Sequence, residues 1–550
     1  MIAPLSIEKV AAGAEQCTRV LAERPNSPDA ARLLAGLLQR FEFGASVDLS
    51  PRGFLAAFDF IDVDRQALCN GALAYLKARP PLAELMACGR TAGWDEAAAL
   101  LARKDARLLR DRLFRAALTY GVVADIEIEL LLTAFRRRVL MTPELSRVRS
   151  VYEFACVLIR QCLNNEFVFF ADDVERSRIA DIKVDIDAMA DGDAAAGGSF
   201  MLLSLYRPFR ETVGQGARAF DKVKPKALRA LLIEDLNVCR MEAAHAKALP
   251  RLTVVTDETS RLVAGQYAAD LYPRWLSLDS PQPGSAIERL GAHFSEDELS
   301  VIDGPCEVLI AGAGTGRQAV HAAFEFGPEA RVLAMDLSAA SLAYGARMAE
   351  LLGTGNLRFA VGDILRLDET KDDFDVIECV GVLHHMADPG EGWRALIRRL
   401  RPGGLMLIGL YSALSRQVIQ SLSEDPDWPG PEADDDALRA YRRTLTDRAA
   451  GSDQTILTDS PDFFTKSGFR DLALHVSERQ FTIPEIGDIL RAEGLEFRGF
   501  SLSDDSKRSY AEMFPDDPPW GTLEHWWTFE QKNPRTFAGM YQFWCRRPAA

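Results

Sequence analysis

The chain has 550 residues, enough for two or three domains with sizeable hydrophobic cores. Its 64 Lys and Arg face 80 Asp and Glu, a net charge of −16, which disfavours DNA or RNA as a substrate because nucleic-acid binding relies on cations against phosphates. No apolar run is long enough to span a bilayer, so we expect no membrane span.

Cysteine and histidine are dispersed along the chain. None of the nine cysteines forms a C-x-x-C pair, and the first ten residues lack the apolar run of a signal peptide. This pattern is typical of reduced thiols, so we expect a cytoplasmic protein. Of the seven histidines only His384 and His385 are adjacent, without ligand spacing to Cys or carboxylate partners, so we expect no metal.

Residues 1–250 are predicted to form a helical domain. Apolar residues recur at helical spacing from Ile7 to Arg24, and Asp29 can cap a second helix that carries Leu33, Leu34 and Leu37. This hairpin resembles one tetratricopeptide unit, but no second copy follows at the period of ~34 residues that such repeats need. The domain is either a partner- or substrate-binding surface or a helical body that packs against a catalytic domain.

Residues 251–290 are predicted to be a linker or lid. Aromatic residues surround a proline in Leu271-Tyr272-Pro273-Arg274-Trp275, a few residues after Tyr267. Tyr267, Tyr272 and Arg274 are candidate substrate-side residues, since two aromatics with an Arg can form a pocket wall or clamp a carboxylate. The alternative is an interdomain plug in which the rings of Tyr272 and Trp275 only fill space.

A glycine loop begins the next domain, predicted at 291–550. The apolar run Val308–Ala311 indicates a buried strand, which turns through Gly312-Ala313-Gly314-Thr315-Gly316 into a helix from about Arg317 to Phe326. A second strand, Arg331–Met335, ends in Asp336, 20 residues beyond Gly316. An acid there commonly binds a ribose, so the pattern predicts a nucleoside site.

The spacing of the glycines distinguishes between nucleosides. The dinucleotide pattern G-x-G-x-x-G would place its third glycine at Arg317, whereas G-x-G-x-G resembles motif I of class I S-adenosylmethionine (SAM) methyltransferases. Further segments resemble this family in the same order: Val361-Gly362-Asp363-Ile364, the strand Phe374–Cys379, Val382-Leu383-His384-His385-Met386 and Leu400–Leu405. A domain that binds NAD, or no nucleoside, is the alternative.

The resemblance implies a Rossmann-like α/β domain with a seven-stranded sheet whose last strand is antiparallel, preceded by a large all-α domain. It implies SAM as the cofactor. By the resemblance the cofactor-binding residues are Gly312, Ala313, Gly314, Gly316, Asp336, Leu337, Asp363, Ile364, Val380 and His384.

The end of the chain extends the resemblance. A fifth strand is predicted at Leu405–Tyr411, followed by a charged helical insertion at about 412–480. Thr482 can cap the next helix, and Leu495–Phe500 and Phe537–Cys545 indicate the last two strands. These segments resemble a bacterial group of methyltransferases with a helical, tetratricopeptide-like N-terminal half.

Four residues are candidates for catalysis. His385 follows the fourth strand, and a neutral imidazole suits proton removal from an acceptor. Tyr411 ends the fifth strand, and His475 and Glu478 lie on a predicted lid. The alternatives are that the histidines after the fourth strand only contact cofactor or backbone, and that His475 and Glu478 form a surface pair.

The sequence therefore predicts a SAM-dependent methyltransferase that acts on an oxygen or nitrogen nucleophile of an unidentified protein, peptide or small molecule. A SAM-binding regulator or scaffold that acts through its helical domain is a second hypothesis. An NAD-dependent oxidoreductase is a third. In each case the helical domain offers a possible partner surface.

Overall fold

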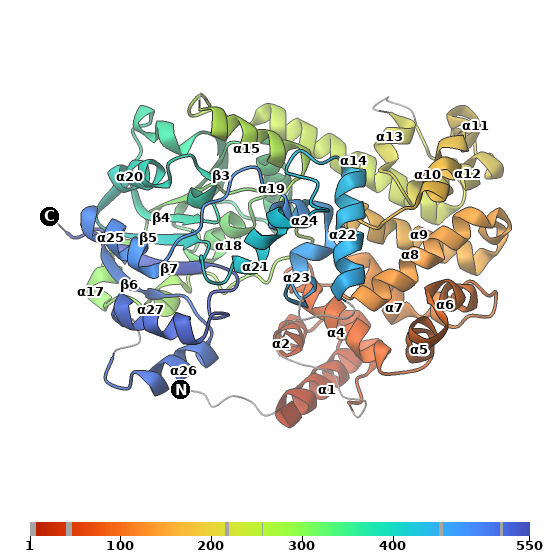
Figure 1. Cartoon of the computed structure of the whole chain (residues 1–550), viewed down its shortest axis with the longest axis horizontal. Helices are drawn as coiled ribbons and strands as arrows, with labels where there is room; N and C mark the ends of the chain where they lie inside the picture. Colours follow the sequence, from red (N-terminus) through yellow and green to blue (C-terminus); the bar gives the residue numbers. More distant parts are fainter. Residues whose placement is uncertain are drawn as a thin grey trace. The chain divides into compact units, whose positions relative to one another are not determined.

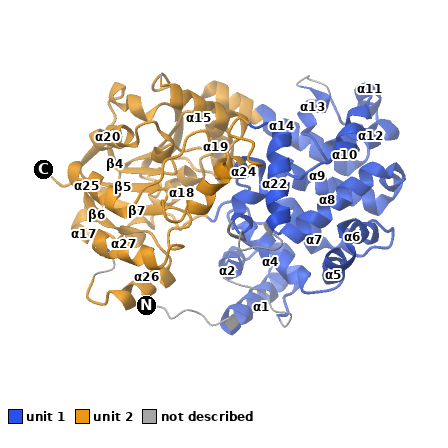
Figure 2. Cartoon of the chain, in the orientation of Figure 1, with its two compact units in different colours: residues 1–240, 275–279, 433–469 blue, residues 241–274, 280–432, 470–550 orange. Residues whose placement is uncertain are grey.

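A computed structural model describes residues 7–39, 47–214, 219–255, 257–449, 455–517 and 521–549. Part of the predicted insertion, residues 450–454, lies outside these ranges. The chain divides into two compact units, coloured separately in Figure 2. Unit 1 comprises residues 1–240, 275–279 and 433–469, and unit 2 comprises residues 241–274, 280–432 and 470–550.

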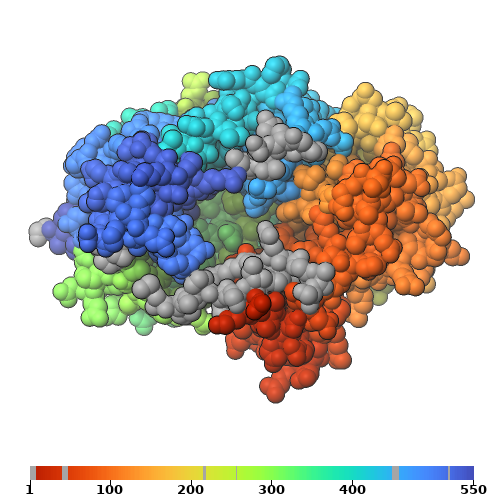
Figure 3. Space-filling model, turned by 60° about the horizontal axis from the view of Figure 1, so that its bottom comes forward, coloured from red at the N-terminus to blue at the C-terminus, as the bar shows by residue number. Residues whose placement is uncertain are grey.

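Unit 1 is helical in its described part, and the outer surface of its first helices is coloured red to orange in Figure 3. The helices of this unit are α1 (Ile7–Glu23), α2 (Pro28–Leu38), α3 (Pro51–Ala57), α4 (Arg65–Lys77), α5 (Leu82–Ala92), α6 (Trp94–Leu101), α7 (Arg112–Tyr120), α8 (Ile126–Met141), α9 (Arg149–Asn164), α10 (Asp173–Asp181), α11 (Ile186–Ala190), α12 (Ala194–Ser204), α13 (Phe209–Val213), α22 (Asp435–Ala449) and α23 (Thr455–Thr458), with α14 (Lys226–Ala248) running on into unit 2. Within the described ranges no helix has both the length and the apolar character needed to cross a membrane.

The predicted insertion contributes helix α22 to unit 1. The buried guanidinium of Arg442 on α22 donates to both carboxylate oxygens of Glu129 on α8, at 2.6 and 2.7 Å. It also lies 4.4 Å from the ring centroid of Phe463. A buried, bidentate ion pair of this kind fixes the position of α22 against α8.

Unit 2 is built on a seven-stranded sheet in the order β3-β2-β1-β4-β5-β7-β6 (Figure 1). Strand β7 pairs antiparallel with both neighbours, and the first five strands are parallel. The strands are β1 (Glu307–Ala311), β2 (Arg331–Asp336), β3 (Leu357–Val361), β4 (Phe374–Val380), β5 (Leu400–Leu410), β6 (Glu496–Phe500) and β7 (Tyr541–Arg546). The predicted α/β fold, with its antiparallel last strand, is confirmed.

Two hydrophobic cores cover the two faces of this sheet. Alternate residues of β1 enter different cores, because successive side chains of a strand point to opposite faces: Leu309 belongs to one and Val308 to the other. Trp393 of α20 (Pro389–Arg399) fills the first core, and Ala319 of α18 (Arg317–Glu325) packs in the second. The parallel strands are therefore buried on both sides.

The remaining helices of unit 2 are α15 (Glu258–Ala269), α16 (Ala286–Leu290), α17 (Glu296–Leu299), α19 (Ala339–Leu352), α21 (Gln417–Gln420), α25 (Ile483–Ala492), α26 (Asp504–Met513) and α27 (Leu523–Lys532), and α24 (Lys466–Ala473) begins in unit 1 and ends in unit 2. The predicted cap of α25 is confirmed: the Thr482 hydroxyl accepts from the backbone N–H of Glu485 in a reciprocal capping box. Strand β5 begins at Leu400, before the predicted start at Leu405, because Leu400 already pairs with Phe374 ahead of an irregularity.

The ion pair between Arg442 and Glu129 gives a stability prediction. Glu129→Gln should lower the free energy of unfolding of unit 1 by about 3 kcal/mol, because it leaves a buried guanidinium without its counter-charge. The double variant Glu129→Leu with Arg442→Met should recover most of this loss, since both charges are then absent. Scanning calorimetry of the full chain measures both.

The exposed pair between Arg443 and Asp447 provides a matched control on the same helix. Asp447→Asn should change stability by less than about 1 kcal/mol, because water screens this pair. A double variant that is no more stable than Glu129→Gln would contradict the assignment of the loss to an unpaired charge.

Candidate functional site

The glycine loop connects β1 to α18. Gly312, Gly314 and Gly316 have φ angles of 72°, 51° and 78°, a region that residues with side chains rarely adopt. A Cβ atom on Gly312 would lie 2.3 Å from a methyl carbon of Val382. The loop therefore needs glycine for its backbone angles and, at Gly312, for space as well.

Asp336 at the end of β2 holds this loop in place. One carboxylate oxygen accepts from the backbone N–H of Gly314 and the other from that of Ser338, each at 2.8 Å. Burial raises the pKa of this carboxyl group, although the three backbone amides that surround it, of Ser338, Gly314 and Leu337, act to lower it. Each oxygen can accept a further hydrogen bond, so the group fits a ribose diol beside the loop.

The neighbouring strand ends in a second acid. Asp363 follows β3, and its Oδ1 accepts from the N–H of Leu365. Its Oδ2 is buried and makes no hydrogen bond within the described part of the chain. Burial raises the pKa of this carboxyl group. A buried acceptor without a donor fits the amino group of an adenine, so the chain's own residues match the nucleoside end of SAM.

The other residues assigned to the cofactor lie at the same edge of the sheet. The N–H of Ala313 donates to the carbonyl of Met335, and Leu337 is half-buried beside Asp336. Ile364 is buried at the start of a short 3₁₀ helix, and Val380 is the half-buried last residue of β4. The carboxyl ends of β1 to β4 thus bring together residues that are distant in sequence.

The segment before the sheet lies against the glycine loop. The Thr315 hydroxyl donates to the carbonyl of Pro273, and a Cβ atom on Gly314 would lie 3.2 Å from the carbonyl oxygen of Tyr272. The guanidinium of exposed Arg274 lies 5.7 Å from the ring centroid of Tyr344. Tyr272 thus meets the loop through its backbone.

A cluster of buried and half-buried polar side chains lies next to the carboxyl ends of β4 and β5. We call it the polar cluster; its members, all in unit 2, are Tyr267, His384, His385, Tyr411, Arg416, Asp471, His475 and Glu478. The structure therefore gathers the catalytic candidates in one place. Arg416 and Asp471 were not predicted from the sequence, because neither stands in a local motif.

Asp471 on α24 is central to the polar cluster. The hydroxyl of Tyr267 donates to its Oδ1 at 2.8 Å, and the hydroxyl of Tyr411 donates to its Oδ2 at 3.4 Å. Burial raises the pKa of this carboxyl group from 3.8 to about 6. Asp471 is therefore a carboxylate held by two phenols and able to take up a proton near neutral pH.

The three histidines of the polar cluster are in ring contact with one another and are neutral. The rings of His385 and His475 stack with centroids 3.7 Å apart, and His384 lies 4.0 Å from the ring of Tyr411. Burial lowers the pKa of His384 to about 3 and that of His475 to about 4, and it also lowers the pKa of His385. All three are uncharged at neutral pH.

Glu478 enters the polar cluster through an ion pair. The guanidinium of Arg416 binds both of its carboxylate oxygens and lies 3.7 Å from the ring centroid of Tyr411. The charges of Glu478 and Arg416 therefore compensate each other, and this pair supports the ring of Tyr411.

A metal could in principle bind three members of the polar cluster. One ligand atom each of His385, Asp471 and His475 lies within 4.8 Å of the other two. However, Nδ1 of His475 accepts from the N–H of Ser477, so the neutral ring keeps its proton on Nε2, which lies 3.2 Å from the hydroxyl of Tyr267. A ligating histidine instead donates from its other nitrogen. The arrangement fits proton transfer better, and the absence of a metal stays a prediction.

Comparisons with known proteins agree with this geometry. Residues 302–442 match the family model described as "Methyltransferase domain". An uncharacterised protein of Synechococcus sp. is 30% identical over 177 residues, 30% of this chain and 41% of that protein. The ubiquinone/menaquinone biosynthesis C-methyltransferase UbiE of Hahella chejuensis is 28% identical over 134 residues, 24% of this chain and 53% of that protein.

Among solved structures, PKMT2 from Rickettsia typhi in complex with AdoHcy aligns with a TM-score of 0.31 at 15% identity, covering 46% of this chain and 53% of that one. The chain spans about half the length, or less, of the curated relatives described above. The family model identifies a methyltransferase domain within the chain, and the sheet order is that of class I, the SAM-dependent methyltransferases.

The raised pKa of Asp471 predicts how stability varies with pH. Between about pH 4 and 6 the folded protein keeps a proton on Asp471 that the unfolded chain has released. The stability of the wild type relative to Asp471→Asn should therefore fall as pH rises through this window, by up to about 3 kcal/mol. Above about pH 6 the difference should be constant.

Melting temperatures of both proteins at several pH values between 4 and 8 measure this difference. Glu391→Gln, which changes an exposed acid of unit 2, is the matched control and should follow the wild type at every pH. A constant difference between the wild type and Asp471→Asn across the whole range would contradict the burial of a titrating carboxyl group.

Proposed function

We propose that the whole protein transfers a methyl group to an oxygen or nitrogen nucleophile, because it contains a class I methyltransferase domain whose cofactor is SAM. The observation that carries the proposal is the position of the polar cluster. It lies at the carboxyl end of β4 and β5, in the same unit as the glycine loop and Asp336. In sheets of this kind ligands bind at the carboxyl ends of the strands.

The chain's own residues would hold the cofactor at three points. Gly312, Gly314 and Gly316 would pass beneath it, Asp336 would bind the ribose hydroxyls and Asp363 the adenine amino group. Supporting positions are Ala313, Leu337, Ile364, Val380 and His384. When bound, the cofactor supplies an activated methyl group on a sulfonium.

The polar cluster would prepare the acceptor. A hydroxyl or amine becomes a better nucleophile when it loses a proton, and Asp471 can accept one with the help of the hydroxyl of Tyr267 and Nε2 of His475. The Nδ1–H of His385 donates to the carbonyl of Ser477 at 2.7 Å, which leaves Nε2 as an acceptor. Arg416 and Glu478 would position Tyr411.

Further parts of the proposal concern the acceptor and its setting. We infer that the acceptor is a protein, a peptide or a small molecule, and that the helical domain offers a partner surface. The lid formed by residues 251–290 would close over the site through Tyr272 and Pro273, whose carbonyls lie against the glycine loop. A cytoplasmic location is supported by the nine free cysteines, which suit a reducing compartment.

Asp336→Ala tests the cofactor site. The variant should bind S-adenosylhomocysteine more weakly by about 1–3 kcal/mol, the scale of hydrogen bonds to a charged group. Isothermal titration measures the dissociation constant, and Glu391→Ala, an exposed acid of the same domain, should leave it unchanged. If Asp336→Ala binds as tightly as the wild type, the ribose assignment is wrong.

Variants of the polar cluster test the acceptor side. Asp471→Asn should lower the rate of methyl transfer by about 100-fold or more while cofactor affinity stays within about twofold, because the carboxylate acts on the acceptor. Tyr267→Phe should lower it less, since the carboxylate remains. The rate of the wild type should rise with pH through about 6, the pKa of Asp471.

Transfer of a labelled methyl group from SAM into fractions of a cell lysate provides the assay for these variants and can identify the acceptor. A pH profile that does not change in Asp471→Asn would exclude this residue as the base. If SAM binds but no fraction becomes labelled, the second hypothesis, a SAM-binding regulator, replaces the enzyme.

A further inference from the structure

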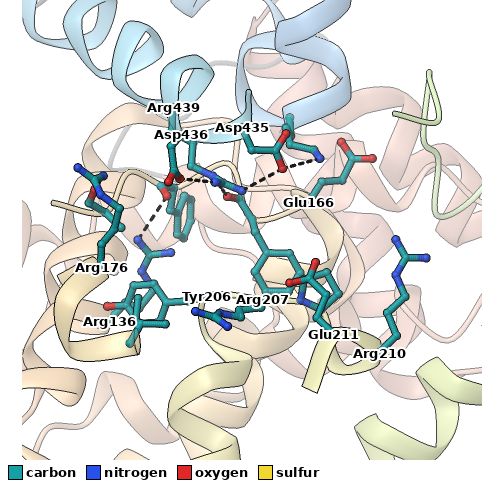
Figure 4. A pocket seen from close by; sticks show the side chains of 16 residues that line it. Arg136, Glu166, Arg176, Tyr206, Arg207, Arg210, Glu211, Asp435, Asp436 and Arg439 are labelled. Carbon is teal, nitrogen blue, oxygen red and sulfur yellow. Dashed lines mark hydrogen bonds and ion pairs between the residues drawn. The ribbon is translucent and has the colours of Figure 1, made fainter. Parts of the chain in front are cut away.

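A cavity lies within unit 1, apart from the residues assigned to methyl transfer. It has a volume of about 370 Å³, within the range of small-molecule sites. Its walls come from α8, the turn that follows α9, α10, the segment that leads into α13, and the start of α22 (Figure 4).

The cavity carries more positive than negative side chains. Six of its lining residues are basic and four are acidic. In Figure 4 Arg136, Arg207 and Arg210 lie along one wall, and Asp435, Asp436 and Arg439 lie along the opposite wall. Arg439 donates to Asp436 at 3.0 Å, and Lys466 donates to Asp435 at 2.9 Å. The acids of this wall are thus already paired with cations.

Arg136 is the most deeply buried charged residue that lines the cavity. Its side chain is only 1% exposed, yet among the described residues no carboxylate oxygen lies within 4 Å of its guanidinium. It donates to the carbonyls of Phe170 and Phe169 at 2.6 and 3.3 Å and lies 4.0 Å from the ring centroid of Tyr206, while Nε has no hydrogen-bond partner. A buried cation without a counter-charge is costly, so an anion would be stabilised here.

The turn that lines the cavity has a strained backbone, a feature that is common at ligand-binding sites. Glu166 and Phe167 are consecutive residues with side chains, and both have φ of 59°. The turn is held by the bond from the N–H of Ser467 to the Glu166 carboxylate at 2.6 Å and by the bond from Arg439 to the Phe167 carbonyl at 2.7 Å. Left-handed residues of this type persist where surrounding contacts enforce them, and they concentrate at binding sites.

We propose that this cavity binds the phosphate or carboxylate group of a small anionic ligand, held by Arg136, Arg207 and Arg210. Guanidinium groups match the planar oxygens of carboxylates and phosphates in pairs of hydrogen bonds. Arg207 and Arg210 are exposed and, within the described ranges, form no ion pair, so they can turn toward a ligand. The site is independent of the proposed methyl transfer.

Isothermal titration with inorganic phosphate and, separately, with succinate tests the proposal and distinguishes the two sources of the anionic group. Both titrations use the full chain at constant ionic strength, because salt screens such contacts. We expect saturable 1:1 binding of at least one anion at millimolar concentration or below. Absence of saturable binding of both anions overturns the proposal.

The variants locate the binding. Arg207→Ala with Arg210→Ala should weaken it about tenfold or more, and Arg136→Met should abolish it. Arg52→Ala, an exposed arginine elsewhere in unit 1, is the matched control and should bind as the wild type does. Arg136→Met removes a buried group. If this variant does not fold, the double variant of the two exposed arginines tests the site in its place. Unchanged affinity in the double variant overturns the assignment.

Discussion

The proposed cofactor site depends on one hydrogen bond, from the backbone N–H of Gly314 to the carboxylate of Asp336. It joins the loop after β1, in which all three glycines have positive φ angles, to the end of β2. Loop and carboxylate therefore position each other. A site whose parts are held in this way before the ligand arrives loses little conformational entropy on binding.

The sequence predicts the strands and the glycine loop of this half of the site well, because their signals are local. Positive φ favours glycine, a buried parallel strand requires a short apolar run, and Asp336 comes directly after such a run. Strands β1, β2 and β4 accordingly lie within one residue of their predicted positions. The later start predicted for β5 reflects the Pro402-Gly403-Gly404 turn signal, which the pairing of Leu400 with Phe374 overrides.

The acceptor side could be predicted only in part, because its contacts are remote in sequence. Tyr267 and Asp471 are 204 positions apart, and no periodic pattern in the sequence indicates a contact between residues so far apart. Arg442 is a similar case, because it stands in a charged, helical segment whose sequence predicts that its cations are exposed to solvent. Its side chain is only 3% exposed because Glu129, 313 positions away, supplies the counter-charge. This ion pair, with the hydrogen bonds from Arg439 to the carbonyl of Phe167 and from the N–H of Ser467 to Glu166, connects residues 433–469 to the rest of unit 1.

Burial inverts the usual order of basicity in the polar cluster. In water a histidine, with a pKa of about 6.5, is the stronger base and an aspartate, at about 3.9, the weaker one. Here desolvation disfavours both the imidazolium and the carboxylate, so the pKa of His475 falls to about 4 while that of Asp471 rises to about 6. A proton released by an acceptor would therefore rest on the carboxylate. The neutral histidines would serve to orient and relay it, a division of roles that residue types alone do not reveal.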